Sequence, residues 1–158
     1  MPSQYNIKDI KTLEMYNGVA LTANLYYGKT FVASIEDRGD GGEVTARWTE
    51  DENLHRHMIQ QWWKQNCEGH WTARFLNDGD CTEMALALLL EYAELNKDAK
   101  SSIVFQSGED TYKVRKSNLS DQSAMMKISK DYPEAKCWNA DTQKWIFIGS
   151  FFAENVSA

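Results

Sequence analysis

The stretch "VALTANLYYGKTFVASIE", residues 19–36, decides the fold class. Apolar and polar residues alternate on both sides of Gly28-Lys29, which is the pattern of strands that bury one face. In the second strand this alternation places Phe31, Ala33 and Ile35 on one face. A Gly at the first central position of a two-residue connection fits a tight turn between antiparallel strands. The sequence therefore predicts a β-hairpin with strands at 19–27 and 30–36.

A glycine-rich, acidic stretch, "IEDRGDGGEV" at residues 35–44, separates this hairpin from a third strand predicted at 43–48. It has no Lys after its glycines, as a phosphate-binding loop needs, and no helix follows directly, as a dinucleotide site needs. Its acidic residues lack the spacing of an EF-hand. A β-turn that uses glycines at positive φ is therefore the favoured interpretation. A weak cation or partner site at Asp37, Arg38 and Asp40 is the alternative.

Two helices follow the three-stranded meander. In residues 49–66 the apolar side chains of Leu54, Met58 and Trp62 recur at a spacing of four, and Thr49 with Glu52 matches a capping box. Residues 81–98, "CTEMALALLLEYAELNKD", are apolar around nearly the whole circumference as far as Leu90, which is typical of a buried helix.

The remaining elements are predicted from shorter patterns. They are a hairpin at 102–116 with its turn at 107–110, a helix at 121–130 capped by Ser120, and a strand pair at 136–138 and 144–152. Together these elements predict an α+β fold: an N-terminal antiparallel meander and later hairpins packed against two or three helices. We expect a single domain over residues 1–158, with a division into sub-modules 1–76 and 77–158 as the alternative.

Composition argues against several classes of protein. The net charge of −6 and the absence of a basic run argue against binding to nucleic acid on electrostatic grounds. The three cysteines are odd in number and widely spaced, and the N-terminal sequence lacks a secretory pattern, so we expect a reduced cytoplasmic protein. The longest apolar run, "MALALLL", is too short to cross a bilayer, so we expect no membrane association.

The residue types that perform catalysis or hold metals occur without their usual spacing. His55, His57, Cys67 and His70 lie within sixteen residues, but His55 and His57 would point about 200° apart on a helix. No signature of a nucleophile surrounds any cysteine. We therefore expect no metal, no cofactor and no catalytic residue, and an enzyme using Cys67 or a divalent cation is the least favoured hypothesis.

Aromatic residues are frequent, with six Trp in the chain. Trp62, Trp63 and Trp71 lie close together in sequence, and Trp62 and Trp63 would project about 100° apart on a helix. Core packing is the favoured interpretation, because Trp is highly buried on average. The functional alternative is an aromatic patch that faces a protein partner, formed by Trp62, Trp63, Trp71 and Tyr26.

Residues 16–42, "YNGVALTANLYYGKTFVASIEDRGDGG", resemble the opening of a group of small, uncharacterised bacteriophage proteins. The shared features are an Asn-Gly, an alternating strand ending in Leu-Tyr, a Gly-Lys turn and an acidic glycine-rich loop. The resemblance implies a phage or prophage accessory protein that acts in the bacterial cytoplasm, and it implies no catalytic residues.

Two hypotheses of function follow. The first is a non-enzymatic protein that binds a host or phage protein and so modulates a host process or defence system. The alternative is a domain that sequesters a small ligand or nucleotide in a pocket of aromatic side chains and arginines, taken from Arg38, Arg47, Arg56 and Arg74. Antiparallel strands leave sheet edges, so a homodimer is also an option.

Overall fold

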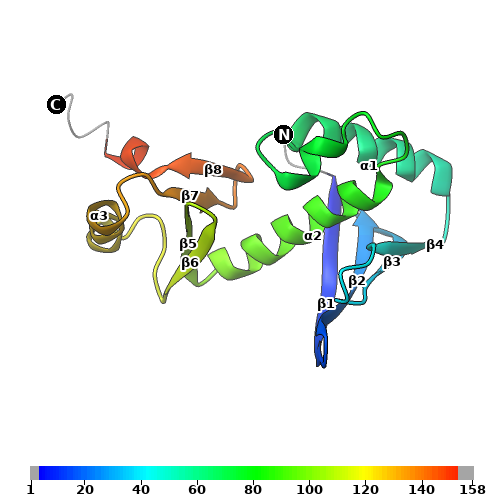
Figure 1. The fold of residues 1–158 in the computed structure, drawn as a ribbon, viewed down its shortest axis with the longest axis horizontal. Helices are drawn as coiled ribbons and strands as arrows, with labels where there is room; N and C mark the ends of the chain where they lie inside the picture. Colours follow the sequence, from blue (N-terminus) through cyan, green and yellow to red (C-terminus); the bar gives the residue numbers. More distant parts are fainter. Residues whose placement is uncertain (1–3, 153–158) are drawn as a thin grey trace. The chain divides into compact units, whose positions relative to one another are not determined.

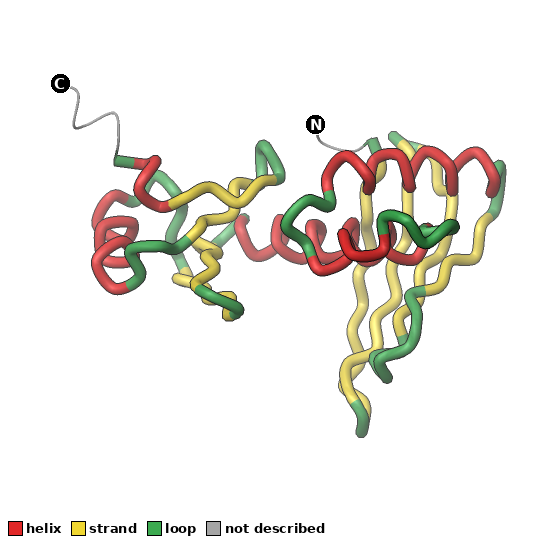
Figure 2. Tube along the Cα trace, turned by 45° about the horizontal axis from the view of Figure 1, so that its top comes forward, coloured by secondary structure: helices red, strands yellow, loops and turns green. Residues whose placement is uncertain are grey.

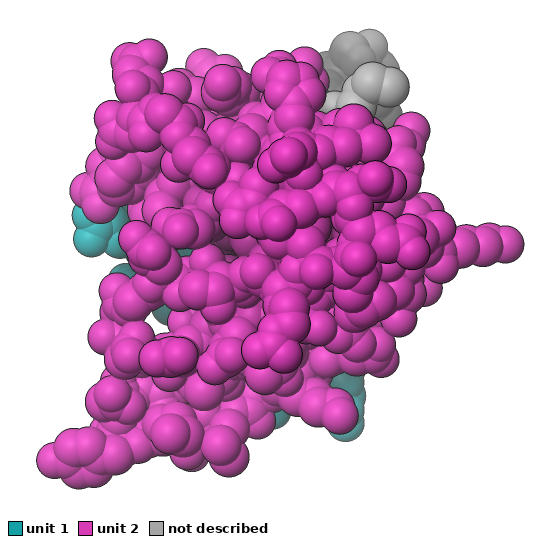
Figure 3. Space-filling model, turned by 90° about the vertical axis from the view of Figure 1, so that its right-hand side faces the viewer, with its two compact units in different colours: residues 1–2, 94–158 teal, residues 3–93 magenta. Residues whose placement is uncertain are grey.

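The predicted hairpin lies at the centre of a four-stranded antiparallel sheet (Figure 1). This sheet comes from a computed structural model that describes residues 4–152. The described chain forms two antiparallel sheets of four strands each and three α-helices, so the α+β prediction is confirmed. It also divides into two compact units, an N-terminal unit that ends at Ala93 and a C-terminal unit that begins at Glu94 (Figure 3). This boundary lies inside a helix rather than at residues 76–77.

The N-terminal sheet contains one strand that the sequence pattern did not indicate. Its order is β1-β2-β3-β4, with β1 at Tyr5–Met15, β2 at Gly18–Tyr27, β3 at Thr30–Asp37 and β4 at Thr45–Trp48. The pairing of β1 with β2 shifts between Lys8 and Lys11, and Asp9 has a φ of 56°. This β-bulge breaks the alternation of β1, so its apolar residues Ile7 and Ile10 are three positions apart instead of two.

A second irregularity in pairing corrects the predicted faces of β3. Leu25 pairs with Ala33 but Tyr26 pairs with Phe31, so Val32 is the extra residue of a bulge. Val32 is therefore buried with Ala33 and Ile35, although strict alternation would place it on the opposite face. Phe31 lies on the opposite face, beside Tyr26.

Helices α1 (Glu52–Asn66) and α2 (Thr82–Ala99) pack against one face of this sheet (Figure 2). The core of the N-terminal unit includes Leu25, Ile35, Ile59, Trp63 and Leu86, which are all almost completely buried. Burial of this apolar surface is the main term that stabilises the unit.

Two predicted details of α1 are wrong. The N-cap is Asp51, and the Thr49 hydroxyl instead donates to the Val32 carbonyl oxygen at 3.1 Å. Leu54 is 54% exposed, whereas the neighbouring His55 is buried. The buried stripe is displaced by one residue because an imidazole with a hydrogen-bonding partner can occupy a core position.

The C-terminal unit has strand order β6-β5-β7-β8. Its elements beyond α2 are β5 (Ser102–Ser107), β6 (Asp110–Arg115), α3 (Gln122–Asp131), β7 (Lys136–Asn139), β8 (Lys144–Phe147) and a 3₁₀ helix at Ile148–Phe151. Asp121, not Ser120, caps α3, and its carboxylate accepts from the Ala124 N–H at 3.1 Å. None of the helices within the described residues is long and apolar enough to cross a membrane.

Candidate functional site: the open face of the N-terminal sheet

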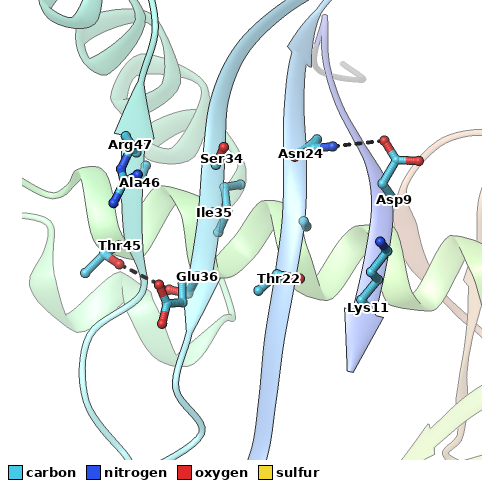
Figure 4. A pocket seen from close by; sticks show the side chains of 11 residues that line it. Asp9, Lys11, Thr22, Asn24, Ser34, Ile35, Glu36, Thr45, Ala46 and Arg47 are labelled. Carbon is cyan, nitrogen blue, oxygen red and sulfur yellow. Dashed lines mark hydrogen bonds between the residues drawn. The ribbon is translucent and has the colours of Figure 1, made fainter. Parts of the chain in front are cut away.

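The face of the N-terminal sheet opposite α1 and α2, here called the open face, carries polar side chains from all four strands (Figure 4). Strand register sets them in two neighbouring rows. One row contains Lys11, Thr22, Glu36 and Thr45, and the other contains Asn24, Ser34 and Arg47 next to Asp9 in the β1 bulge. These side chains line a shallow hollow of about 460 Å³.

An aromatic pair borders the hollow at one end of the open face. The rings of Tyr26 and Phe31 meet edge to face, with 5.7 Å between their centroids. The Lys8 ammonium lies 5.1 Å from the centre of the Tyr26 ring. The bulge at Val32 places Phe31 on this face, and the strand pairing of Lys8 with Asn24 brings the cation to it. Tyr26, a candidate interaction residue from the sequence, is therefore half-buried on an accessible surface.

The other end of the open face is apolar and exposed. Leu13 pairs with Ala20 and Met15 with Gly18, so both side chains continue the face beyond Lys11 toward the β1–β2 turn. Leu13 is 64% exposed and Met15 is 49% exposed, and Tyr16 at the turn is fully exposed. The β1–β2 hairpin, dark blue in Figure 1, projects beyond the other two strands of its sheet. Sequence patterning missed this end because an exposed apolar residue looks the same in sequence as a buried one.

The charges of the open face are unevenly paired. The Asp9 carboxylate accepts from the Asn24 amide at 3.0 Å, and Glu36 lies 3.7 Å from Arg38. Among the described residues neither Lys11 nor Arg47 forms an ion pair. The anions of this surface therefore already have partners, whereas two of its cations have none.

The glycine-rich loop that follows β3 is a structural turn that supports the projecting hairpin. The Asp37 carboxylate accepts from the Gly39 N–H and the Asp40 carboxylate from the Gly42 N–H, each at 2.9 Å. Gly39 has a φ of +72° and packs so closely on β2 that a Cβ atom there would lie 2.1 Å from the Val19 carbonyl oxygen. Turn geometry and close backbone approach thus account for this composition.

The tryptophans that the sequence singled out occupy different environments. Trp63 is fully buried, and its indole N–H donates to the Thr72 hydroxyl at 2.9 Å, so it has no surface with which to contact a partner. Trp62 is also buried, with its ring edge-on to Tyr92. Only Trp71, in the 3₁₀ helix Trp71–Phe75, is exposed, at 54%. Core packing, the interpretation favoured from the sequence, describes the first two.

The histidines and cysteines are held in structural contacts. His55 is buried with its Nδ1 2.8 Å from the Tyr5 hydroxyl and its ring stacked on Trp48. His70 contacts the Thr72 hydroxyl through Nδ1 and the Glu91 carboxylate through Nε2. Thr72 has no exposed surface, so this chain of groups cannot deliver a nucleophile to a substrate.

All three cysteines are free and buried, and burial raises the pKa of each thiol, that of Cys137 to about 11. Within residues 4–152 no group of three His, Cys, Asp or Glu side chains is placed to hold a metal ion.

The arginines proposed for a ligand pocket do not converge. Arg47 lines the open face, but Arg56 forms ion pairs with Glu52 at 3.0 Å and with Asp80 at 3.3 Å. Arg74 lies over the ring of Phe75. These contacts therefore do not form the aromatic pocket with several guanidinium groups that the alternative hypothesis requires.

Comparison with protein-family profiles, with curated protein sequences and with solved structures gave no match. The geometry of the open face is therefore the basis on which a function is proposed.

Proposed function

We propose that this chain is a non-enzymatic interaction protein that docks on another protein through the open face and the tip of the β1–β2 hairpin. The observation that carries the proposal is the exposure of Leu13, Met15 and Tyr16 together on a projecting hairpin. Single exposed apolar residues are ordinary on protein surfaces, but a group of large ones marks an interaction site. Tyr and Met are also enriched in the cores of protein interfaces.

The face, rather than an edge of the sheet, is the surface that supports docking. Strand β1 forms one edge, and its bulge at Asp9 and its two lysines hinder the addition of another strand. Strand β4 forms the other edge and contains only four residues. These features favour a different protein as the partner over a second copy that pairs edge to edge.

The resemblance of residues 16–42 to small bacteriophage proteins supports a further part of the proposal. The partner would then be a host or phage protein in the bacterial cytoplasm, and binding would modulate a host process or defence system. Tyr16, at the turn of the hairpin, and the glycines of the glycine-rich loop lie in the segment that carries this resemblance, whereas Leu13 and Met15 precede it.

Site-specific photo-crosslinking tests the proposed surface. A p-benzoyl-phenylalanine in place of Tyr16 should form a discrete adduct in bacterial lysate, while the same probe in place of Tyr112 on β6 should not. Tyr112 is the matched control because it is also an exposed tyrosine, at 37%, and lies in the C-terminal unit. Equal adducts at both positions, or none at Tyr16, would contradict the proposal.

The hollow of about 460 Å³ supports a second candidate, a small polar ligand held on the open face. Its lining of hydroxyl, amide and charged groups provides both hydrogen-bond donors and acceptors. Native mass spectrometry of protein purified from cells would detect a bound small molecule as a discrete mass increment. A spectrum containing the unmodified mass alone would exclude a tightly bound ligand.

A further inference from the structure

The N-terminal unit has a strongly asymmetric distribution of charge. Residues 4–93 contain fourteen Asp and Glu against eight Lys and Arg. On the open face itself the order is reversed, because Lys8, Lys11 and Arg47 outnumber Asp9 and Glu36. The open face therefore carries a small excess of positive charge within an acidic unit.

From this asymmetry we infer the chemistry of the partner: the open face binds an acidic segment of another protein. The inference rests on the proposed function and deepens it. The partner's carboxylates meet Lys11 and Arg47, whose charges have no ion-pair partner among the described residues. Complementary charge steers an approaching partner to one surface and fixes its register.

The two ends of the face define the rest of the segment. The aromatic pair at Tyr26 and the apolar pair at Met15 and Gly18 are eight positions apart along β2, which corresponds to roughly 26 Å in an extended strand. Apolar side chains on the partner, separated by this distance, would bury Tyr26 and Phe31 at one end and Leu13 and Met15 at the other. Such buried aromatic and apolar anchors supply most of the energy in protein interfaces.

A single-stranded nucleic acid is also anionic, but it fits these contacts less well. Its bases would need a free aromatic ring for stacking, and the Lys8 ammonium already lies over Tyr26. Asp9 and Glu36 stand among the cations, where they would repel a continuous row of phosphates. Leu13 and Met15 would meet no apolar counterpart on a phosphate backbone.

Selection from a random peptide library tests the inference, with peptides of about twelve residues so that they span the face. The wild-type protein, a Lys11→Glu/Arg47→Glu variant and a Lys64→Glu/Arg74→Glu variant are immobilised in parallel. The last is a matched control, because it reverses one exposed Lys and one exposed Arg of the same unit away from the open face. Circular dichroism melting checks that both variants remain folded.

Peptides enriched on the wild-type protein should be acidic and carry apolar residues near both ends. Their dissociation constants should rise at least about tenfold for Lys11→Glu/Arg47→Glu and less than about twofold for the control, since reversing an interfacial charge costs several-fold in affinity. The affinity should also fall with added salt.

Enrichment of basic or uncharged peptides would overturn the inference, as would equal weakening by the two variants. Binding of a short oligo-thymidylate that Lys11→Glu/Arg47→Glu abolishes, without enrichment of acidic peptides, would assign the face to nucleic acid instead. Failure of the inference is distinguishable from failure of the proposed function. A crosslinked adduct at Tyr16 without enrichment of acidic peptides would refute only the inference. The absence of both the adduct and any enriched peptide would refute the inference and the proposed function together.

Discussion

Replacing Gly39 by Ala should destabilise the N-terminal unit far more than the same replacement at Gly41, two residues along the same loop. Both glycines have positive φ, +72° at Gly39 and +83° at Gly41, so both substitutions force an L-residue into the left-handed region. That strain costs about 1–2 kcal/mol at each position. The difference between the two sites arises from what the new methyl group meets.

At Gly41 a Cβ atom has nothing within 4 Å. At Gly39 it would lie 2.1 Å from the carbonyl oxygen of Val19, 2.4 Å from its carbonyl carbon and 2.9 Å from the nitrogen of Ala20. All three are backbone atoms of a paired strand, so none of them can rotate away as a side chain does. Separating the loop from β2 adds roughly 1–3 kcal/mol, the usual cost of overpacking. We therefore expect the free energy of unfolding to fall by about 2–5 kcal/mol for Gly39→Ala and by about 1–2 kcal/mol for Gly41→Ala.

Native-state amide hydrogen exchange is the appropriate assay, because it reports opening of β2 and β3 separately from the C-terminal unit. The Gly39→Ala variant should lose more protection than Gly41→Ala in these strands, and most of all at Val19 and Ala20. The Gly39→Ala substitution should also reduce photo-crosslinking from p-benzoyl-phenylalanine in place of Tyr16, since the loop supports the hairpin. Equal protection in the two variants would refute the argument that this loop braces β2.

Three further predictions concern buried or paired groups. Burial and the nearby Glu43 carboxylate raise the pKa of Glu83 above its unfolded value, so folding favours the protonated form and stability falls as pH rises through the folded pKa. Glu83→Gln should therefore increase the urea midpoint at pH 7 and leave it unchanged below the unfolded pKa of about 4.3; an equal increase at both pH values would contradict this. Cys137, with its pKa raised to about 11, should react with a thiol reagent at pH 8 only after denaturation, and rapid native labelling would disprove its burial. Tyr5→Phe removes the hydroxyl that lies 2.8 Å from His55 and should cost about 1–2 kcal/mol in urea unfolding; no loss would show that the contact contributes nothing.

The fold class and most elements could be predicted from sequence because their patterns are local. The hairpin of β2 and β3, the apolar helix α2 and the β5–β6 hairpin follow from alternation, turn residues and helical composition. Strand β1 could not be predicted in the same way, because the bulge at Asp9 breaks its period of two. The buried face of α1 differs from the predicted one because His55, although polar, is buried against Tyr5.

The candidate site was less predictable than the fold. Of the aromatic candidates from the sequence only Tyr26 lies on the open face, while Trp62 and Trp63 are in the core. Burial of a tryptophan depends on contacts with distant segments, such as that of Trp62 with Tyr92, and no local pattern encodes them. The two rows of the open face depend on strand register, which two bulges alter.

The net charge of the chain illustrates why a sum over residues is a poor guide to binding. The value of −6 argues against an anionic partner only if the charge is spread evenly. Strand register instead places Lys11 on β1 and Arg47 on β4, the two edge strands, on the surface that faces away from the helices. Interactions with charges farther than a Debye length, about 8 Å at physiological salt, are largely screened there. An approaching carboxylate therefore responds to the nearest cations more than to the distant acidic residues. Because these two side chains are exposed and lie outside the core, their reversal should change binding while leaving the fold intact.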